Sequence, residues 1–213
     1  MVKLKYPLVF LVLAAVLTPV LAFAHQPRVV KSLGHVTVEE PEISKVYYGN
    51  LDGEPKVFEL SSVKEFNLYV NIMVPDLPDI EKNKIVTISS AGRTIASFGG
   101  EKAEWEPYYE KFAGDMYFKG PEFREKTSPG EYFITVSSAM NEGKYALVIG
   151  ETESFPLREI IKAFFTLPAV KSQFFGEAWW HAYLSRAGLM VLGVVLGAVI
   201  IAYGAISFLF RRR

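Results

Sequence analysis

The chain has 213 residues, enough for one domain of ordinary size and too few for a large multidomain enzyme. It contains no cysteine, which excludes disulfide scaffolds, cysteine-ligated metal sites and thiol catalysis. Its 23 basic and 23 acidic residues cancel, but residues 25–186 hold 18 of the bases and all 23 acids, so the excess of bases lies at the two ends. An acidic central region argues against nucleic acid as a partner.

Residues 1–24 have the layout of a cleavable secretory signal. Lys3 and Lys5 precede an apolar run over 8–21, and residues 22–24 read Ala-Phe-Ala, the small-x-small triplet found at signal cleavage sites. We therefore expect cleavage after Ala24, which would make His25 the mature N-terminus. The alternative is a signal anchor that is not cleaved.

Between residues 43 and 150, short stretches that alternate apolar and polar residues are separated by turn residues. The clearest is 66–74, where every second side chain is apolar. Further strands are expected at 45–48, 56–60, 84–89, 93–98, 129–136 and 142–149, with one near 35–39, and hairpin turns at 50–53, 91–93 and 141–143. Eight or nine strands without intervening helices predict a mainly β fold, an antiparallel β-sandwich of jelly-roll or immunoglobulin-like type over residues 25–154.

The spacing of the apolar residues changes after residue 155. Apolar residues recur every three or four positions over 157–167, which predicts an amphipathic helix ended by Pro168, with a second short helix over 169–175. Trp179, Trp180 and Tyr183 follow, as in an aromatic belt at a membrane interface. We expect residues 155–186 to be juxtamembrane helices that lie on the outer leaflet or pack beneath the sandwich.

Residues 187–210 carry no charge and are followed by three arginines at 211–213. A helix of this length spans a hydrocarbon core of about 30 Å, and terminal arginines favour the cytoplasmic side. With the signal, this predicts a single-pass protein of the cytoplasmic membrane whose N-terminal ectodomain lies outside and whose basic tail lies in the cytoplasm. Gly193 and Gly197 have the spacing that lets two membrane helices approach, so a homodimer is a candidate assembly, although glycine is common in membrane helices.

Two strands share the pattern Gly-x-Tyr-x-apolar-x-apolar, at residues 130–136 and 143–149. They resemble the closing strands of extracellular β-sandwich modules such as the pre-peptidase C-terminal domain and some carbohydrate-binding modules, and residues 57–60 with the strand at 66–74 resemble the opening strands. The order of signal, sandwich and tail is similar to that of prokaryotic single-pass surface proteins. The resemblance implies a β-sandwich at a cell surface and implies no activity. The chain departs from a pre-peptidase module by a long aromatic insertion at 101–123.

That insertion holds a dense group of aromatic residues interleaved with acids. Aromatic faces beside carboxylates are typical of a sugar-binding surface, which makes five rings candidate ligand-binding residues. The alternative is that the rings fill one end of the sandwich or pack on the helices of 155–175, which is the commoner role of aromatic side chains. The five candidates are Trp105, Tyr108, Tyr109, Phe112 and Tyr117, with Phe118 beside them and Glu104, Glu106, Glu110 and Asp115 between.

Two chemical roles are alternatives to ligand binding by aromatic rings. His25, as the mature N-terminus, could chelate copper through its amine and ring nitrogen, with His35 as a second ligand. The acids of 101–115 could serve a hydrolase that uses two carboxylates, although the sequence singles out no pair. A glycine-rich phosphate loop, a nucleophile elbow and a zinc-protease motif are all absent from the sequence.

These observations favour a membrane-anchored extracytoplasmic binding or scaffold protein that has no catalytic activity or cofactor and recognises a partner protein or a glycan. The first alternative is a small metal-handling or hydrolytic surface protein. The second is an accessory subunit of a membrane complex.

Overall fold

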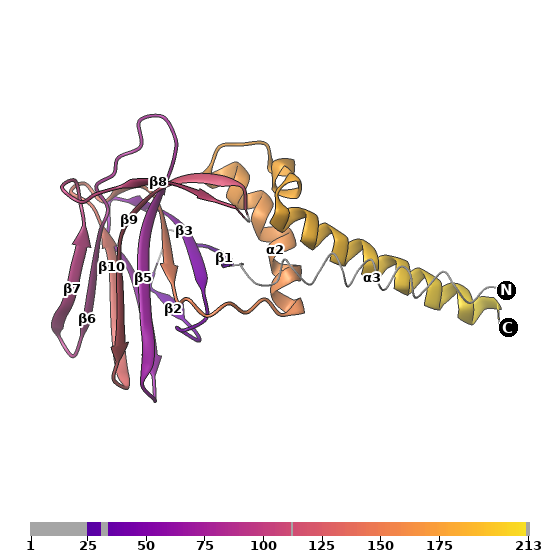
Figure 1. Ribbon diagram of the computed structural model, residues 1–213, viewed down its shortest axis with the longest axis horizontal. Helices are drawn as coiled ribbons and strands as arrows, with labels where there is room; N and C mark the ends of the chain where they lie inside the picture. Colours follow the sequence, from indigo (N-terminus) through magenta and orange to yellow (C-terminus); the bar gives the residue numbers. More distant parts are fainter. Residues whose placement is uncertain (1–24, 31–33, 112, 212–213) are drawn as a thin grey trace.

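The computed structural model describes residues 25–30, 34–111 and 113–211, and its strands form two facing sheets (Figure 1). Sheet A contains, in spatial order, β1 (Gln26–Val29), β3 (Lys45–Asp52), β11 (Glu142–Ile149), β5 (Phe66–Pro75), β9 (Asp115–Thr127) and β8 (Glu106–Glu110). Sheet B contains β2 (Val36–Val38), β4 (Lys56–Ser62), β10 (Gly130–Ser137), β6 (Ile85–Ser90) and β7 (Arg93–Gly99). The mainly β prediction is confirmed, and the predicted segments correspond to eight of these strands. The strands β1, β8 and β9 were not predicted from the sequence.

Both sheets are mixed, whereas the sequence predicts an antiparallel sandwich. β1 pairs with β3 and β2 with β4 in parallel, and the other described pairs are antiparallel. A tight hairpin cannot join parallel neighbours. The chain leaves sheet A after β1, contributes β2 to sheet B, and returns to sheet A as β3. The antiparallel prediction is therefore right for the central strands and wrong at the N-terminal edge.

The three predicted turns have different outcomes. Ala91 and Gly92 connect β6 to β7 in an antiparallel hairpin, and both have the positive φ that a type I′ turn requires. The turns at 50–53 and 141–143 instead connect strands of different sheets, since β3 and β11 belong to sheet A while β4 and β10 belong to sheet B. Turn residues encode a reversal of the chain, but they do not encode whether the next strand pairs in the same sheet.

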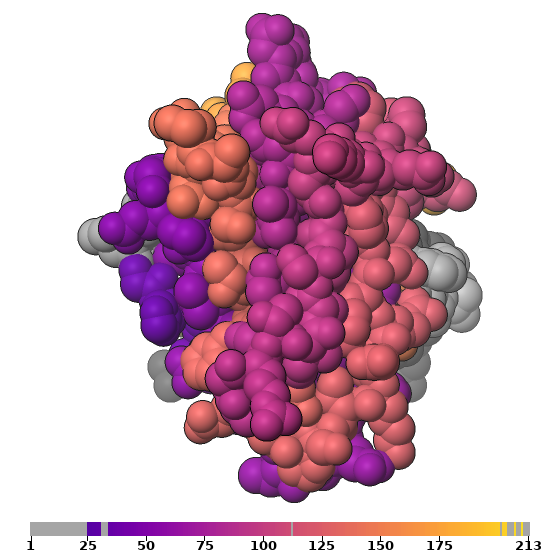
Figure 2. Space-filling view, turned by 90° about the vertical axis from the view of Figure 1, so that its left-hand side faces the viewer, coloured from indigo at the N-terminus to yellow at the C-terminus, as the bar shows by residue number. Residues whose placement is uncertain are grey.

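Alternating side chains of the two sheets fill the interior of the sandwich. Leu68, Val70 and Ile72 of β5 are fully buried, as the period of two predicts. They belong to one core cluster with Phe58 and Leu60 of sheet B and with side chains of β6, β10 and β11. Figure 2 shows the side turned away from the helices, with the β6–β7 hairpin in magenta across the middle and the loop 76–84 projecting at one end.

The outer face of sheet A is covered by helices. α2 (Leu157–Ala169), the π-helical η1 (Val170–Phe174) and the 3₁₀-helical η2 (Trp179–Leu184) form a collar, residues 157–184, between the sandwich and α3 (Arg186–Arg211) (Figure 1). Phe174 packs edge-on against Tyr48 of β3, with ring centroids 5.0 Å apart. This cover explains why β3, β5 and β11 are largely buried on both faces.

The helix that the sequence predicts to end at Pro168 continues through it. α2 includes Pro168 in its last turn, and η1 follows directly. Proline has no N–H, so the carbonyl of Phe164, four residues earlier, loses its helical donor. The Tyr183 hydroxyl of η2 donates to this carbonyl at 3.1 Å. A side chain from the next helix therefore supplies the bond that the proline cannot make.

The segment 187–210, for which the sequence predicts a membrane span, lies in α3. In the described part of the chain, no helix combines the length and the apolar character that crossing a membrane requires. The first turns of α3 pack on the collar, where Ala187, Met190 and Val191 are buried against Ile160 and Ala163 of α2. The signal predicted over 1–24 and the last two arginines of the tail lie outside the described residues.

Candidate functional site

The aromatic insertion of the sequence forms the β8–β9 hairpin at one edge of sheet A. β8 is the terminal strand of that sheet and is paired with β9. The pairing places Tyr109 opposite Met116 and Glu110 opposite Asp115. Because opposite residues project to the same face, each of these pairs forms one unit of the hairpin surface.

The five candidate rings differ in their exposure to solvent. Tyr117 is 1% exposed and packs against Phe175, with centroids 5.4 Å apart. Trp105 packs on the sandwich core, and its indole N–H donates to the Gly100 carbonyl at 3.2 Å. Tyr108 and Tyr109 are 37% and 52% exposed. Phe112 lies outside the described residues.

Met116 belongs with these exposed residues, although it was not among the candidates predicted from the sequence. It is 41% exposed and lies opposite Tyr109 in the hairpin. The available signal was the alternation of β9, in which Asp115 and Tyr117 are buried and Met116 between them is not. The hairpin therefore presents two tyrosines and a methionine at the edge of the sheet.

A buried ion pair attaches this hairpin to the collar. The Lys171 ammonium of η1 donates to the Asp115 carboxylate, and both side chains are buried. Burial raises the pKa of Asp115 to about 6, although the hydrogen bond and charge of Lys171 act in the opposite direction. The Glu177 carboxylate lies 3.6 Å from the Lys171 nitrogen and 3.1 Å from Nδ1 of His181. A chain of polar contacts thus runs from the hairpin to η2.

A second ion pair attaches α2 to the edge of sheet A. Arg28 of β1 lies 2.8 Å from the buried Glu159 carboxylate, and Lys162 donates to the same carboxylate at 3.0 Å. Burial raises the pKa of Glu159, but Lys162 and Arg28 outweigh it and hold the pKa below its ordinary value. The collar therefore contacts the sandwich through two charged pairs as well as through its aromatic rings.

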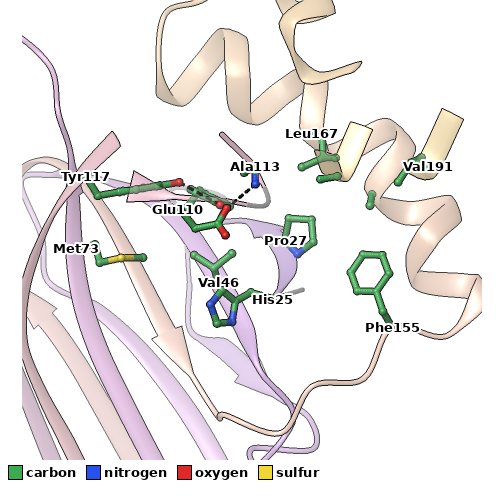
Figure 3. A pocket seen from close by; sticks show the side chains of 13 residues that line it. His25, Pro27, Val46, Met73, Glu110, Ala113, Tyr117, Phe155, Leu167 and Val191 are labelled. Carbon is green, nitrogen blue, oxygen red and sulfur yellow. Dashed lines mark hydrogen bonds between the residues drawn. The ribbon is translucent and has the colours of Figure 1, made fainter. Parts of the chain in front are cut away.

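A narrow crevice lies between sheet A and the collar (Figure 3). His25, Glu110, Tyr117 and Phe155 are among its lining residues, and its volume of about 20 Å³ is sufficient for one water molecule. Nδ1 of His25 lies 2.5 Å from the Ser44 hydroxyl. Burial lowers the pKa of His25, and the charge of Glu110 opposes this shift.

The two histidines considered as copper ligands line different cavities. His25 lines the crevice beneath the collar, whereas His35 lines open clefts beside β2 and β4. Over residues 25–30, 34–111 and 113–211, no group of three or more His, Cys, Asp and Glu side chains is placed to hold a metal ion.

Gly193 is one of the two glycines that the sequence suggests for a homodimer contact. A Cβ added at this position would meet no described atom within 4 Å.

No protein-family model and no curated protein matches the chain. Among solved structures, it is similar to the pre-peptidase C-terminal domain of a collagenase from Bacillus anthracis, at 10% identity and a TM-score of 0.34 over 59% of this chain and 95% of that one. It is also similar to CorA, a surface-associated copper-binding protein of Methylomicrobium album BG8, at 7% identity and a TM-score of 0.29 over 59% and 100%. A ruminal GH26 endo-β-1,4-mannanase matches at 15% identity and a TM-score of 0.29 over 57% and 22%. At these TM-scores the similarities carry no conclusion about function.

Proposed function

We propose that the chain is a membrane-tethered, extracytoplasmic binding module without catalytic activity, and that it recognises a partner protein through the β8–β9 hairpin. The observation that carries this proposal is the pair Tyr109 and Met116, exposed side by side at the terminal strand of sheet A. Tyrosine and methionine are enriched in the cores of protein interfaces relative to the rest of the surface.

The contacts beneath the hairpin support this role. Tyr117 packs against Phe175 and Asp115 pairs with Lys171, so the collar supports the hairpin from below. A surface that is ordered before binding loses less conformational entropy when a partner arrives. A rigid hairpin is therefore better suited to recognition than a free loop.

The edge strand β8 is better suited to recognising a partner through its side chains than to pairing with a strand of that partner. Pro107 lies within β8 and has no backbone N–H to donate, and Glu106 places a charge at the start of the strand. Proline and charges at an edge strand oppose pairing with another strand. A protein partner is favoured over a glycan because Trp105, the largest ring of the segment, packs on the core and bonds to Gly100.

The tether is proposed from the sequence. Residues 187–210 are uncharged and precede Arg211, which supports an ectodomain outside and a basic tail inside. The side chains of residues 201, 204–206, 208 and 209 lie outside those that the structure describes. Resistance of the full chain to extraction from membranes by alkaline carbonate tests the tether. Release into the carbonate supernatant would contradict it.

Crosslinking and pull-down of the full chain from its native membranes tests the recognition surface. We expect one stoichiometric protein partner, which is lost when Tyr109→Ser and Met116→Ser are combined. The matched control combines Val63→Ser and Met140→Ser, two exposed residues outside the hairpin, and should retain the partner. A partner that is retained by the hairpin variant or lost by the control would show that the hairpin is not the recognition surface.

A further inference from the structure

An open cleft of about 350 Å³ lies beneath the tip of the β8–β9 hairpin, bordered by the collar and the start of α3. Its volume is within the range of small-molecule sites. The polar side chains that line it are those of Tyr109, Lys111, Lys171, Glu177, His181, Ser185 and Arg186.

The cations of this cleft are only partly compensated. The charge of Lys171 is balanced by the buried Asp115, and Glu177 lies between Lys171 and His181. Lys111 and Arg186 are exposed, and neither forms an ion pair with any residue that the structure describes. The cleft therefore carries two cationic groups that are available to an anion.

We propose that this cleft binds a phosphate group, with Lys111 and Arg186 as its principal ligands. A guanidinium presents two parallel N–H donors that match two phosphate oxygens, and an ammonium adds a compact positive charge. The Tyr109 hydroxyl is a further donor at the cleft wall. Ser185 is not assigned as a ligand, because its hydroxyl bonds to the Ala182 carbonyl and accepts the Gly188 N–H.

The phosphate can come from a lipid headgroup or from a soluble molecule, and the surroundings favour the headgroup. Arg186 directly precedes the uncharged segment 187–210, and Trp179, Trp180 and Leu184 are exposed beside it. Aromatic side chains of this kind occur at the level of lipid headgroups. The choice of a lipid source rests on the proposed tether, whereas the anion site itself does not.

Calorimetric titration of the full chain in a non-ionic detergent tests the site without requiring a bilayer. The probes are inorganic phosphate, dihexanoyl-phosphatidylglycerol and the uncharged dihexanoylglycerol. We expect both phosphate compounds to bind and the uncharged one not to bind. The combined Lys111→Gln and Arg186→Gln variant should lose at least about tenfold in affinity. The control Lys126→Gln, an exposed lysine in β9, should bind like the wild type.

The relative affinities identify the source of the phosphate. Tighter binding of the lipid than of inorganic phosphate supports a headgroup site, and equal binding supports a soluble phosphate. The proposal is overturned if neither phosphate compound binds, or if the combined variant binds both as well as the wild type does. Unchanged melting temperatures of the variants confirm that they are folded. Failure of this test leaves the hairpin and the tether unaffected, since their tests substitute neither Lys111 nor Arg186 and use other measurements.

Discussion

Asp115, the first residue of β9, forms a buried ion pair with Lys171 of η1, 56 positions further along the chain. Removing a carboxylate and an ammonium from water costs several kcal/mol, and their mutual attraction does not always repay this cost, so a buried pair is weak evidence for stability. The contact does link the two elements that carry its partners, the β8–β9 hairpin and the collar. The hairpin, the collar and the start of α3 therefore form one connected unit.

The protonation of Asp115 makes stability depend on pH. Its pKa rises from 3.8 in the unfolded chain to about 6 in the folded one, mainly through burial and with Glu177 and Glu110 adding to the shift. The folded state therefore holds a proton that the unfolded state has lost, and stability decreases as the pH rises from about 4 to about 6. At about 1.4 kcal/mol for each pKa unit, the decrease is at most about 3 kcal/mol.

Urea unfolding of the full chain in detergent, from pH 4 to pH 7, measures this effect against Asp115→Asn. Asparagine cannot ionise, so the variant should lack the part of the pH dependence that the wild type shows in this window. If the free energy of unfolding changes with pH in the same way in the two proteins, Asp115 is not the source of the pH dependence.

Removal of the lysine tests the pair from the other side. Lys171→Met leaves the Asp115 carboxylate buried without its cation, and we expect a loss of about 3 kcal/mol in the free energy of unfolding. The control is Lys126→Met, which removes an exposed pair with Glu65 and should have little effect. Equal unfolding midpoints for the two variants would contradict a structural role of the buried pair.

The bond from Tyr183 to the Phe164 carbonyl predicts a specific weakness of the collar. Tyr183→Phe keeps the ring and removes the donor, leaving the carbonyl above Pro168 without a partner, at an expected cost of about 1–2 kcal/mol. Tyr108→Phe is the control, because the Tyr108 hydroxyl forms no hydrogen bond within the described residues. Amide exchange of η2 and the end of α2 should increase in the first variant alone. Unchanged exchange there would show that the bond does not hold the two helices together.

Gly49 of β3 is predicted to tolerate no side chain. It lies opposite Tyr145 in the sheet, and a Cβ at this position would collide with the Tyr145 ring. Because the interior is close-packed, Gly49→Ala should cost about 1–3 kcal/mol through displacement of that ring. Gly193→Ala, which meets open space, should leave the midpoint of thermal unfolding unchanged. A stable Gly49→Ala protein would mean that the ring can move at little cost.

The sequence predicts the local structure well and the pairing of distant segments poorly. The alternation of 66–74 identifies β5, and Ala91-Gly92 identifies a true hairpin, because both signals depend on neighbouring residues. The strands β8 and β9 were not predicted, because aromatic and acidic residues obscure their alternation. The predicted helix end at Pro168 was wrong, because the compensating donor, Tyr183, comes from another element.

The exposure of the candidate residues could not be predicted from the sequence. The aromatic density of 101–118 indicated the segment that we propose as the recognition surface, yet which rings are exposed depends on where the collar packs. Tyr117 is buried because Phe175, 58 positions away in sequence, covers it, whereas Tyr109, opposite Met116 in the hairpin, is 52% exposed. Met116 was missed because its exposure follows from the register of two unpredicted strands. Contacts between distant segments of this kind are not encoded in local periodicity.

The β8–β9 hairpin is the surface through which we propose that the protein binds its partner. Site-specific photocrosslinking in living cells measures this directly, with a benzophenone side chain introduced at Tyr109 in one protein and at Met140, a 73% exposed residue outside the hairpin, in another. We predict one discrete crosslinked product from position 109 and none from position 140. No product at 109, or the same product at both positions, would contradict it.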